Sequence, residues 1–244
     1  MLLILGAPFI GSFLGVVAER WPKGDTFVFG RSRCLHCRHV LGLRDLIPVI
    51  SWLASRAKCR YCGQRIPIRY PIIEICALAL AIWPVVELPA ELAWISAMFG
   101  WTLLTLALID LRWLWLPQAL TAPLAAVGLL VAGLWRSDIP FDQLIGAVAG
   151  FLVMTGVAWL YRRCRGREGL GEGDAGLFGA LGAWVGWQGL PTVLLYAGIS
   201  GLLLLAMQRT TGRVVKLTTR LAFGPHLCLG GWLVWLYGPL YLDW

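Results

Sequence analysis

The fold is decided by runs such as "LAWISAMFGWTLLTLALI" (Leu92–Ile109), an uncharged apolar segment that is followed directly by Asp110. An α-helix needs about 20 predominantly apolar residues to cross the ~30 Å hydrocarbon core of a bilayer. The run is close to that length and carries no charge. It therefore predicts a membrane-spanning helix with a carboxyl group at one end.

The same pattern recurs along the 244 residues of the chain, which is 59% hydrophobic, 14% charged and has a mean hydropathy of +0.73. Soluble domains carry about 25% charged residues, so a soluble domain is excluded. We predict an all-α polytopic membrane protein of about eight transmembrane helices. The predicted spans are Leu2–Val17, Tyr70–Val86, Leu92–Ile109, Leu116–Trp135, Phe141–Tyr161, Asp174–Trp187, Leu190–Met207 and Ala222–Leu242.

Positive charge is distributed unevenly between these spans. Eleven of the 21 Lys and Arg residues lie between the first and second spans, nine more follow the third, fifth and seventh, and only Arg136 lies on the other side. Short cytoplasmic loops retain Lys and Arg, so we place the odd-numbered loops in the cytoplasm and both termini outside. Membrane orientation thus accounts for the net charge of +8, and we expect no nucleic-acid partner. The first span lacks a basic n-region and is predicted to be a retained helix.

The one sizeable segment outside the spans, residues 19–69, contains two Cys-x-x-Cys pairs. Cys34 and Cys37 are separated from Cys59 and Cys62 by 21 residues. A disulfide is disfavoured in the reducing cytoplasm, and a segment of about fifty residues builds little core. We therefore predict a four-cysteine zinc site that supplies folding energy, with redox chemistry and free thiols as the alternatives.

The predicted domain organisation follows from these two features. Residues 1–18 form the first transmembrane helix, residues 19–69 a cytoplasmic zinc-binding domain, and residues 70–244 a seven-helix membrane domain. His36 and His39 lie beside the first cysteine pair and are treated as bystanders, because four cysteines already complete a zinc site.

Two carboxyl groups stand at span ends on the predicted cytoplasmic side, Asp110 at the end of the third span and Asp174 at the start of the sixth. An ionisable group at membrane depth is costly and is a functional candidate by default. Two carboxyls from separate helices can share one proton, so that one activates water while the other polarises a scissile carbonyl. The alternative is structural: Asp174 caps a helix, and Asp110 pairs with Arg112 or marks a span end.

An ordered set of motifs resembles the prepilin leader peptidase family, the membrane aspartic peptidases of type IV pili and type II secretion. The motifs extend over nearly the whole chain and read "GSFLGVVAERWP", "SRCLHC", "LRDLIPVISWL", "KCRYCGQRIPIRYPIIE", "LIDLRWLWLP", "GEGDAGLFGALGAWVGW" and "FGPHLCLGG". The resemblance implies an eight-span peptidase with a cytoplasmic zinc domain, often also an N-methyltransferase that uses S-adenosylmethionine. It implies Asp110 and Asp174 as the catalytic pair.

Two glycines and two departures from the family pattern accompany these motifs. We interpret Gly171 and Gly173 as making room for an extended substrate backbone beside Asp174. The family usually has Lys where this chain has Gly176, a cation that could tune the carboxyl pair. Its N-terminal motif usually reads GSFLN, whereas Gly15 stands here in place of the Asn, a change that concerns the methyltransferase activity.

The position of the carboxyl pair also indicates the substrate. A pair at the cytoplasmic surface suits a protein with a basic leader and an apolar helix in the bilayer, and the resemblance implies prepilins or pseudopilins of the bacterial inner membrane, cut between a Gly and usually a Phe. Anionic lipid is expected to attract both partners, because residues 19–69 carry eleven basic and three acidic residues. Glu74 either orients a substrate amine or pairs with Arg69.

Three other functions stay open on the residues alone. A scaffold or receptor with a zinc module explains the cysteines and the spans, but not two acids at matching depth. A transporter needs polar groups near the bilayer midplane, and charges within the spans are scarce. A protease of the presenilin kind shares the carboxyl pair but needs neither the cysteines nor the N-terminal motifs. The sequence predicts no oligomeric state.

Overall fold

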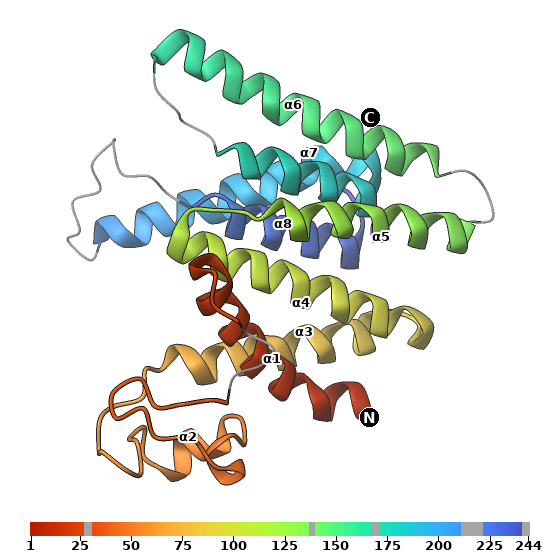
Figure 1. The fold of residues 1–244 in the computed structure, drawn as a ribbon. Coiled ribbons are helices and arrows are strands. Elements are labelled where there is room, and N and C mark those ends of the chain that lie inside the picture. Colours follow the sequence, from red (N-terminus) through yellow and green to blue (C-terminus); the bar gives the residue numbers. More distant parts are fainter. Residues whose placement is uncertain (27–30, 137–139, 167–170, 211–221, 241–244) are drawn as a thin grey trace. The chain divides into compact units, whose positions relative to one another are not determined.

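The computed structural model describes residues 1–26, 31–136, 140–166, 171–210 and 222–240. Within these ranges every regular element is helical, apart from two isolated β-bridges (Figure 1). The long helices are α1 (Leu2–Arg20), α3 (Arg69–Glu87), α4 (Ala90–Trp113), α5 (Gln118–Arg136), α6 (Phe141–Arg165), α7 (Glu172–Thr210) and α8 (Gly224–Tyr237). Three short elements lie between α1 and α3: η1 (Trp21–Lys23), η2 (Leu43–Asp45) and α2 (Ile50–Ala54).

Five of the described helices are long and apolar enough to cross a membrane. They cover Leu2–Lys23, Arg69–Glu87, Ala90–Trp113, Phe141–Cys164 and Gly173–Thr210, and Gln118–Leu134 forms a shorter apolar helix. The predicted all-helical membrane fold is therefore confirmed, whereas the count of eight spans stays a prediction. The predicted last span, Ala222–Leu242, corresponds to α8, which begins at Gly224 and ends at Tyr237. The last two residues of that predicted span, 241 and 242, lie outside the described residues.

The sixth and seventh predicted spans form the single element α7, whose 39 residues contain a break. Gly186 has φ +75° and ψ +170° there, a conformation that is essentially restricted to glycine. In Figure 1 the arms before and after the break run in opposite directions, the first in teal and the second in light blue. Gly186 thus lets the chain reverse, and residues 172–185 and 187–210 are two arms rather than one long rod.

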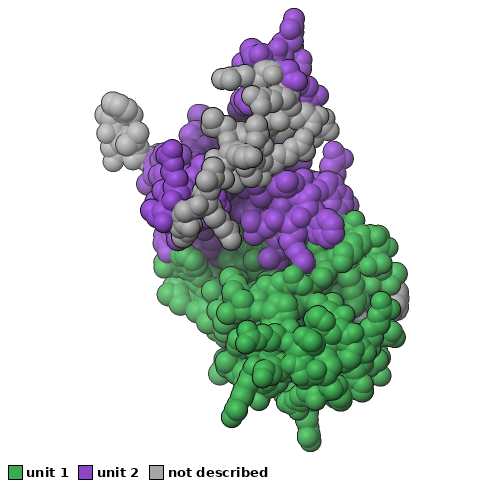
Figure 2. Space-filling model, turned by 90° about the vertical axis from the view of Figure 1, so that its left-hand side faces the viewer, with its two compact units in different colours: residues 1–105 green, residues 106–244 purple. Residues whose placement is uncertain are grey.

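The chain divides into two compact units, residues 1–105 and 106–244, which are coloured separately in Figure 2. In the first unit, α1 packs closely against α3. A Cβ atom at Gly11 would lie 2.7 Å from the Cβ of Ala77 and 2.8 Å from the Cα of Glu74, so only glycine permits this approach. A small apolar core that includes Leu3, Ala77 and Trp101 lies beside the crossing.

In the second unit, glycines hold α6 against the first arm of α7. A Cβ at Gly182 would overlap the backbone of Gly146, and a Cβ at Gly150 would lie 2.9 Å from the carbonyl oxygen of Phe178. These glycines belong to the sequences "GAVAG" and "GAWVG", whose small-x-x-x-small spacing is typical of closely packed membrane helices. The tight packing gives α7 a fixed position, and its first turn carries Asp174.

Candidate active site and metal centre

Asp110 lies in the last turn of α4, and its side chain is only 5% exposed. Its Oδ2 atom accepts a hydrogen bond of 2.9 Å from the backbone N–H of Gly224, the first residue of α8. A Cβ atom at residue 224 would lie 2.7 Å from the same Oδ2. Glycine is therefore required at this position if the carboxyl group is to keep its place.

Asp174 lies in the first turn of α7 and is 7% exposed. Its Oδ2 accepts a hydrogen bond of 3.1 Å from the backbone N–H of Gly171, and its own N–H donates to the Gly171 carbonyl oxygen at 3.1 Å. This reciprocal pattern caps the start of α7, as the structural alternative predicted. The same carboxyl group also lies within electrostatic range of Asp110, so capping and pairing occur together.

Gly173 has a different role from the one predicted. A Cβ there would lie 2.7 Å from the Cβ of Leu116 and 3.2 Å from the Leu116 carbonyl oxygen. Leu116 belongs to the short connection between α4 and α5, so Gly173 lets that connection pack on the start of α7. The space beside Gly173 is filled by the protein itself, and the interpretation that it admits substrate backbone is wrong. At Gly171, a Cβ would lie 3.3 Å from Oδ2 of Asp174.

One further residue lies near the pair, and a second follows Asp174 by two positions in the sequence. Cys228, one turn into α8, is buried and lies within electrostatic range of both carboxyl groups. Gly176, where the family usually has Lys, faces Thr121: a Cβ there would lie 3.3 Å from the threonine Oγ1. Cys228, Leu116 and Gly224 lie within the quoted motifs, but sequence analysis assigned them no role at the site, because their contacts there arise from tertiary packing.

The arrangement brings together the two carboxyls that the sequence singled out. Each uses its Oδ2 atom to accept a backbone N–H, and among the described residues neither Oδ1 atom has a hydrogen-bond partner. Two buried carboxyls with one free oxygen each can hold a shared proton and a water molecule. The geometry therefore suits general acid–base chemistry on a polar bond.

The four cysteines of residues 19–69 are also brought together. The sulfur atoms of Cys34, Cys37, Cys59 and Cys62 all lie within 4.8 Å of one another, and those of Cys34 and Cys62 are 3.8 Å apart. Zinc–sulfur bonds of about 2.3 Å in a tetrahedron place neighbouring sulfurs about 3.8 Å apart. The cluster can therefore hold a metal ion, and its all-sulfur donor set and spacing fit zinc.

The two cysteine pairs sit in turns of the same design. The N–H of Cys34 donates to the carbonyl oxygen of His39 at 3.0 Å, and the N–H of Cys59 donates to that of Gln64 at 2.8 Å. The fifth residue of each turn has a left-handed backbone, Gly63 with φ +72° and Arg38 with φ +57°. Backbone N–H groups of Cys37 and His36 donate to the Cys34 sulfur and lower the pKa of its thiol to about 6, which favours the thiolate that metals bind.

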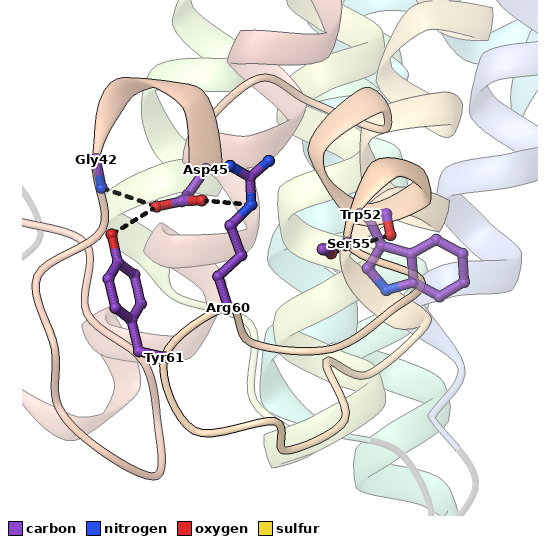
Figure 3. A network of polar contacts seen from close by, with 6 residues as sticks. All are labelled: Gly42, Asp45, Trp52, Ser55, Arg60 and Tyr61. Carbon is purple, nitrogen blue, oxygen red and sulfur yellow. Dashed lines mark hydrogen bonds and ion pairs between the residues drawn. The ribbon is translucent and has the colours of Figure 1, made fainter.

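A polar network joins the second cysteine turn to the segment between the turns (Figure 3). Asp45 accepts from the backbone N–H of Gly42 at 3.2 Å, lies 3.3 Å from the Arg60 guanidinium and 3.5 Å from the Tyr61 hydroxyl. Nearby, Ser55 donates to the carbonyl oxygen of Trp52 at 3.2 Å. The cysteine cluster and this network lie in a segment that has little apolar core.

Glu74 does not pair with Arg69, one of the two partners considered for it. Its Oε2 accepts a hydrogen bond of 2.7 Å from the backbone N–H of Val49, while Arg69 pairs instead with Glu19 at 3.5 Å. The predicted pairing of Glu74 with Arg69 is therefore wrong, and Glu74 ties α3 to the segment beside the cysteines.

Comparisons with known proteins match almost the whole chain. Residues 4–88 match the model of the bacterial Peptidase A24 N-terminal domain, and residues 97–206 match that of the type IV leader peptidase family. No solved structure was found to match.

The chain is also similar to curated proteins named prepilin leader peptidase/N-methyltransferase. That of Aeromonas hydrophila is 34% identical over 100% of this chain and 92% of its own length. Those of Burkholderia pseudomallei and Stutzerimonas stutzeri are 39% and 35% identical, over 87% and 97% of this chain and 69% and 89% of their own lengths.

Proposed function

The chain belongs to the type IV leader peptidase family, and we propose that Asp110 and Asp174 are the catalytic pair of its peptidase reaction. It is a prepilin leader peptidase and N-methyltransferase, which removes the leader of a prepilin and methylates the new N-terminus. The observation that carries the proposal is the pair itself: two buried carboxyls from different helices, within electrostatic range, each with one unbonded oxygen among the described residues.

The hydrolysis uses one carboxylate, one protonated carboxyl and one water molecule. The ionised group takes a proton from water as its oxygen bonds to the scissile carbonyl carbon, while the protonated group donates to the carbonyl oxygen. The C–N bond then breaks and the leaving amine takes a proton from the pair. The hydrogen bonds from Gly224 and Gly171 hold the two carboxyls in position, so the pair needs no rearrangement during the reaction.

The eight-span topology remains our proposal for this chain, with both termini outside. The end of α4, the α4–α5 connection and the starts of α7 and α8 meet at the carboxyl pair. Charge counting assigns all of these helix ends to the cytoplasm. The reversal at Gly186 supports counting the two arms of α7 as separate spans.

We further propose that the four cysteines hold structural zinc in a cytoplasmic domain of residues 19–69, between membrane segments 1–18 and 70–244. Their sulfur spacing and the shared turn design support this assignment. The metal would supply folding energy. S-adenosylmethionine, bound by the first unit, would supply the methyl group that the amine of the substrate's new N-terminus accepts.

The substrates proposed are prepilins or pseudopilins with a basic leader and an apolar helix, in the bacterial inner membrane. The test is cleavage of a synthetic prepilin by the full chain in detergent, with the cut mapped by mass spectrometry. Asp110→Asn and Asp174→Asn should each reduce cleavage to background, because the pair acts as a unit. Glu91→Gln, which changes an exposed acid at the other end of α4, should cut like the wild type.

Both Asn variants are nearly isosteric, and the side chain introduced by Asp174→Asn retains an oxygen that can cap α7. Loss of cleavage with an unchanged melting temperature would therefore mean lost chemistry rather than lost folding. Substantial cleavage by either Asn variant would show that the pair is not catalytic.

A further inference from the structure

We propose that a cavity in the first unit binds the methyl donor S-adenosylmethionine, with Glu74 as the counter-ion of its sulfonium group. The inference rests on the methyltransferase activity and names the site where that activity occurs. The cavity measures about 400 Å³, within the ~300–1,000 Å³ of small-molecule pockets. It is lined by α1, by the segment around the cysteines and by the start of α3.

The methylation reaction needs a pocket of its own. Both carboxyls of the hydrolytic pair belong to the second unit, and methyl transfer to an amine uses neither an activated water nor a shared proton. The cavity lies wholly within residues 12–74 of the first unit, so it is built from different residues throughout.

One carboxyl group on the cavity wall, that of Glu74, suits a cationic group on a ligand, although Lys and Arg residues also line the cavity. Three acids of the wall are partly or fully buried. Glu19 pairs with Arg69, and Asp45 pairs with Arg60. Glu74 is 7% exposed, lies beside Ser12 and accepts a hydrogen bond from the Val49 N–H; among the described residues no Lys, Arg or His pairs with it. A buried carboxylate that lies beside a cavity and has no cationic partner in the protein can be neutralised by a positively charged ligand.

The backbone at Val49 fixes the direction of that carboxylate. Val49 has φ +60° and ψ −51°, a region that a β-branched residue occupies only under strain. The strained conformation aims its N–H at Glu74 Oε2, 2.7 Å away. Strain of this kind concentrates at ligand sites, where the surrounding structure holds the residue in place.

The rest of the wall suits the other parts of the donor. Trp52 presents an indole ring that its Nε1–H anchors to the carbonyl oxygen of Ile66 at 3.1 Å, and Tyr70 lies on the same wall. Aromatic faces suit both an adenine ring and a sulfonium cation. Arg33 and Lys58 also line the cavity and can bind the carboxylate of the donor.

The departure at Gly15 leaves this wall intact. On α1 the cavity is lined by Ser12, Val16 and Glu19, which share one face of the helix. A Cβ at Gly15 would instead meet Ile73 at 3.5 Å, an ordinary contact away from the cavity. The chain therefore retains the methyl-donor site even though the Asn of the family motif is absent.

The experiment measures binding by the purified full chain in detergent, using calorimetry with S-adenosylmethionine and with S-adenosylhomocysteine, which lacks the sulfonium charge. Glu74→Gln keeps the shape of the side chain and an oxygen for the Val49 N–H. It should lower the affinity for S-adenosylmethionine relative to S-adenosylhomocysteine by about tenfold, as expected for a lost charge interaction. An equal change for both ligands, or no change, would overturn the counter-ion role.

A second pair of variants tests the location. Ser51→Trp adds bulk to a lining residue of α2, whereas Ile50→Trp places the same ring on the adjacent, 63% exposed position outside the cavity. Only the first should abolish binding of both ligands, while prepilin cleavage continues in both variants. Undiminished binding by Ser51→Trp would overturn the site.

The two proposals fail differently. A wild type that binds S-adenosylmethionine and methylates with Ser51→Trp unaffected would refute the cavity but leave the activity standing. A wild type that cleaves but neither binds the donor nor methylates would refute both.

Discussion

Replacing Gly224 by alanine should disable the peptidase while leaving the fold intact. The added Cβ would lie 2.7 Å from Oδ2 of Asp110, which is 0.7 Å short of the 3.4 Å at which ordinary contact begins. The Asp110 side chain can rotate away, whereas the backbone of α8 is packed. We therefore expect the carboxyl group to move and the helices to stay.

The size of the effect follows from that displacement. A shift approaching 1 Å in a reacting group costs about 10²-fold in rate, equivalent to about 2.7 kcal/mol of transition-state stabilisation. Stability should change by less than about 1 kcal/mol. Alanine is better than glycine in a helix, but Pro225 disfavours a helical backbone at the residue before it, and the two effects oppose each other.

The assay is kcat/KM for a synthetic prepilin, measured beside the melting temperature and the rate of methylation of a pre-cut peptide. Gly156→Ala is the matched control, since a Cβ there meets nothing within 4 Å. We expect cleavage to fall in Gly224→Ala only, with methylation unchanged in both. A Gly224→Ala enzyme that retains more than a third of wild-type kcat/KM would refute the idea that this contact positions Asp110.

Four further predictions concern the proposed zinc domain, the break in α7 and the topology. Purified protein should contain about one zinc per chain by metal analysis, and Cys59→Ser should release it and raise the proteolytic sensitivity of residues 19–69, with cleavage impaired less than in the Asp variants. Gly63→Ala should lower domain stability by about 1 kcal/mol in chemical unfolding, because its φ is +72°, yet preserve metal binding, as Arg38 does in the twin turn. Gly186→Ala should lower the melting temperature through backbone strain worth about 1–3 kcal/mol, since the space for a Cβ is adequate at 3.7 Å from Asp142. A reporter fused to the C-terminus should be active only outside the cytoplasm; cytoplasmic activity would remove a span.

Much of the site could be predicted because its chemistry resides in side chains of unusual type for their surroundings. Asp110 and Asp174 were identifiable as acids at the ends of apolar runs, and the cysteines by their spacing. Gly224 could not be identified in this way, since its contribution is a backbone N–H and an absent Cβ, placed 114 residues from Asp110 by tertiary packing.

Three features of the structure differ from the sequence-based predictions or could not be predicted, and each has a physical cause. Gly173 follows Gly171 in a motif that indicates open space, but only the packing of Leu116 shows that this space is occupied. The reversal at Gly186 depends on the backbone conformation of one glycine within a continuous apolar run. Composition predicted two spans in this region, but it could not predict the backbone conformation that joins them. Glu74 and Arg69 are near neighbours in sequence, yet each bonds to a more distant partner.

The capping bonds of Asp174 bear on how members of this family can decay over evolutionary time. A descendant relieved of the need to cut prepilins would still lose helix stability on losing Asp174, because its side chain caps the start of α7. Asp110 caps no helix start and lies buried near the end of α4. An uncharged residue would avoid the free-energy cost of burying a carboxyl group there. Drift in an inactive lineage should therefore replace Asp110 before Asp174.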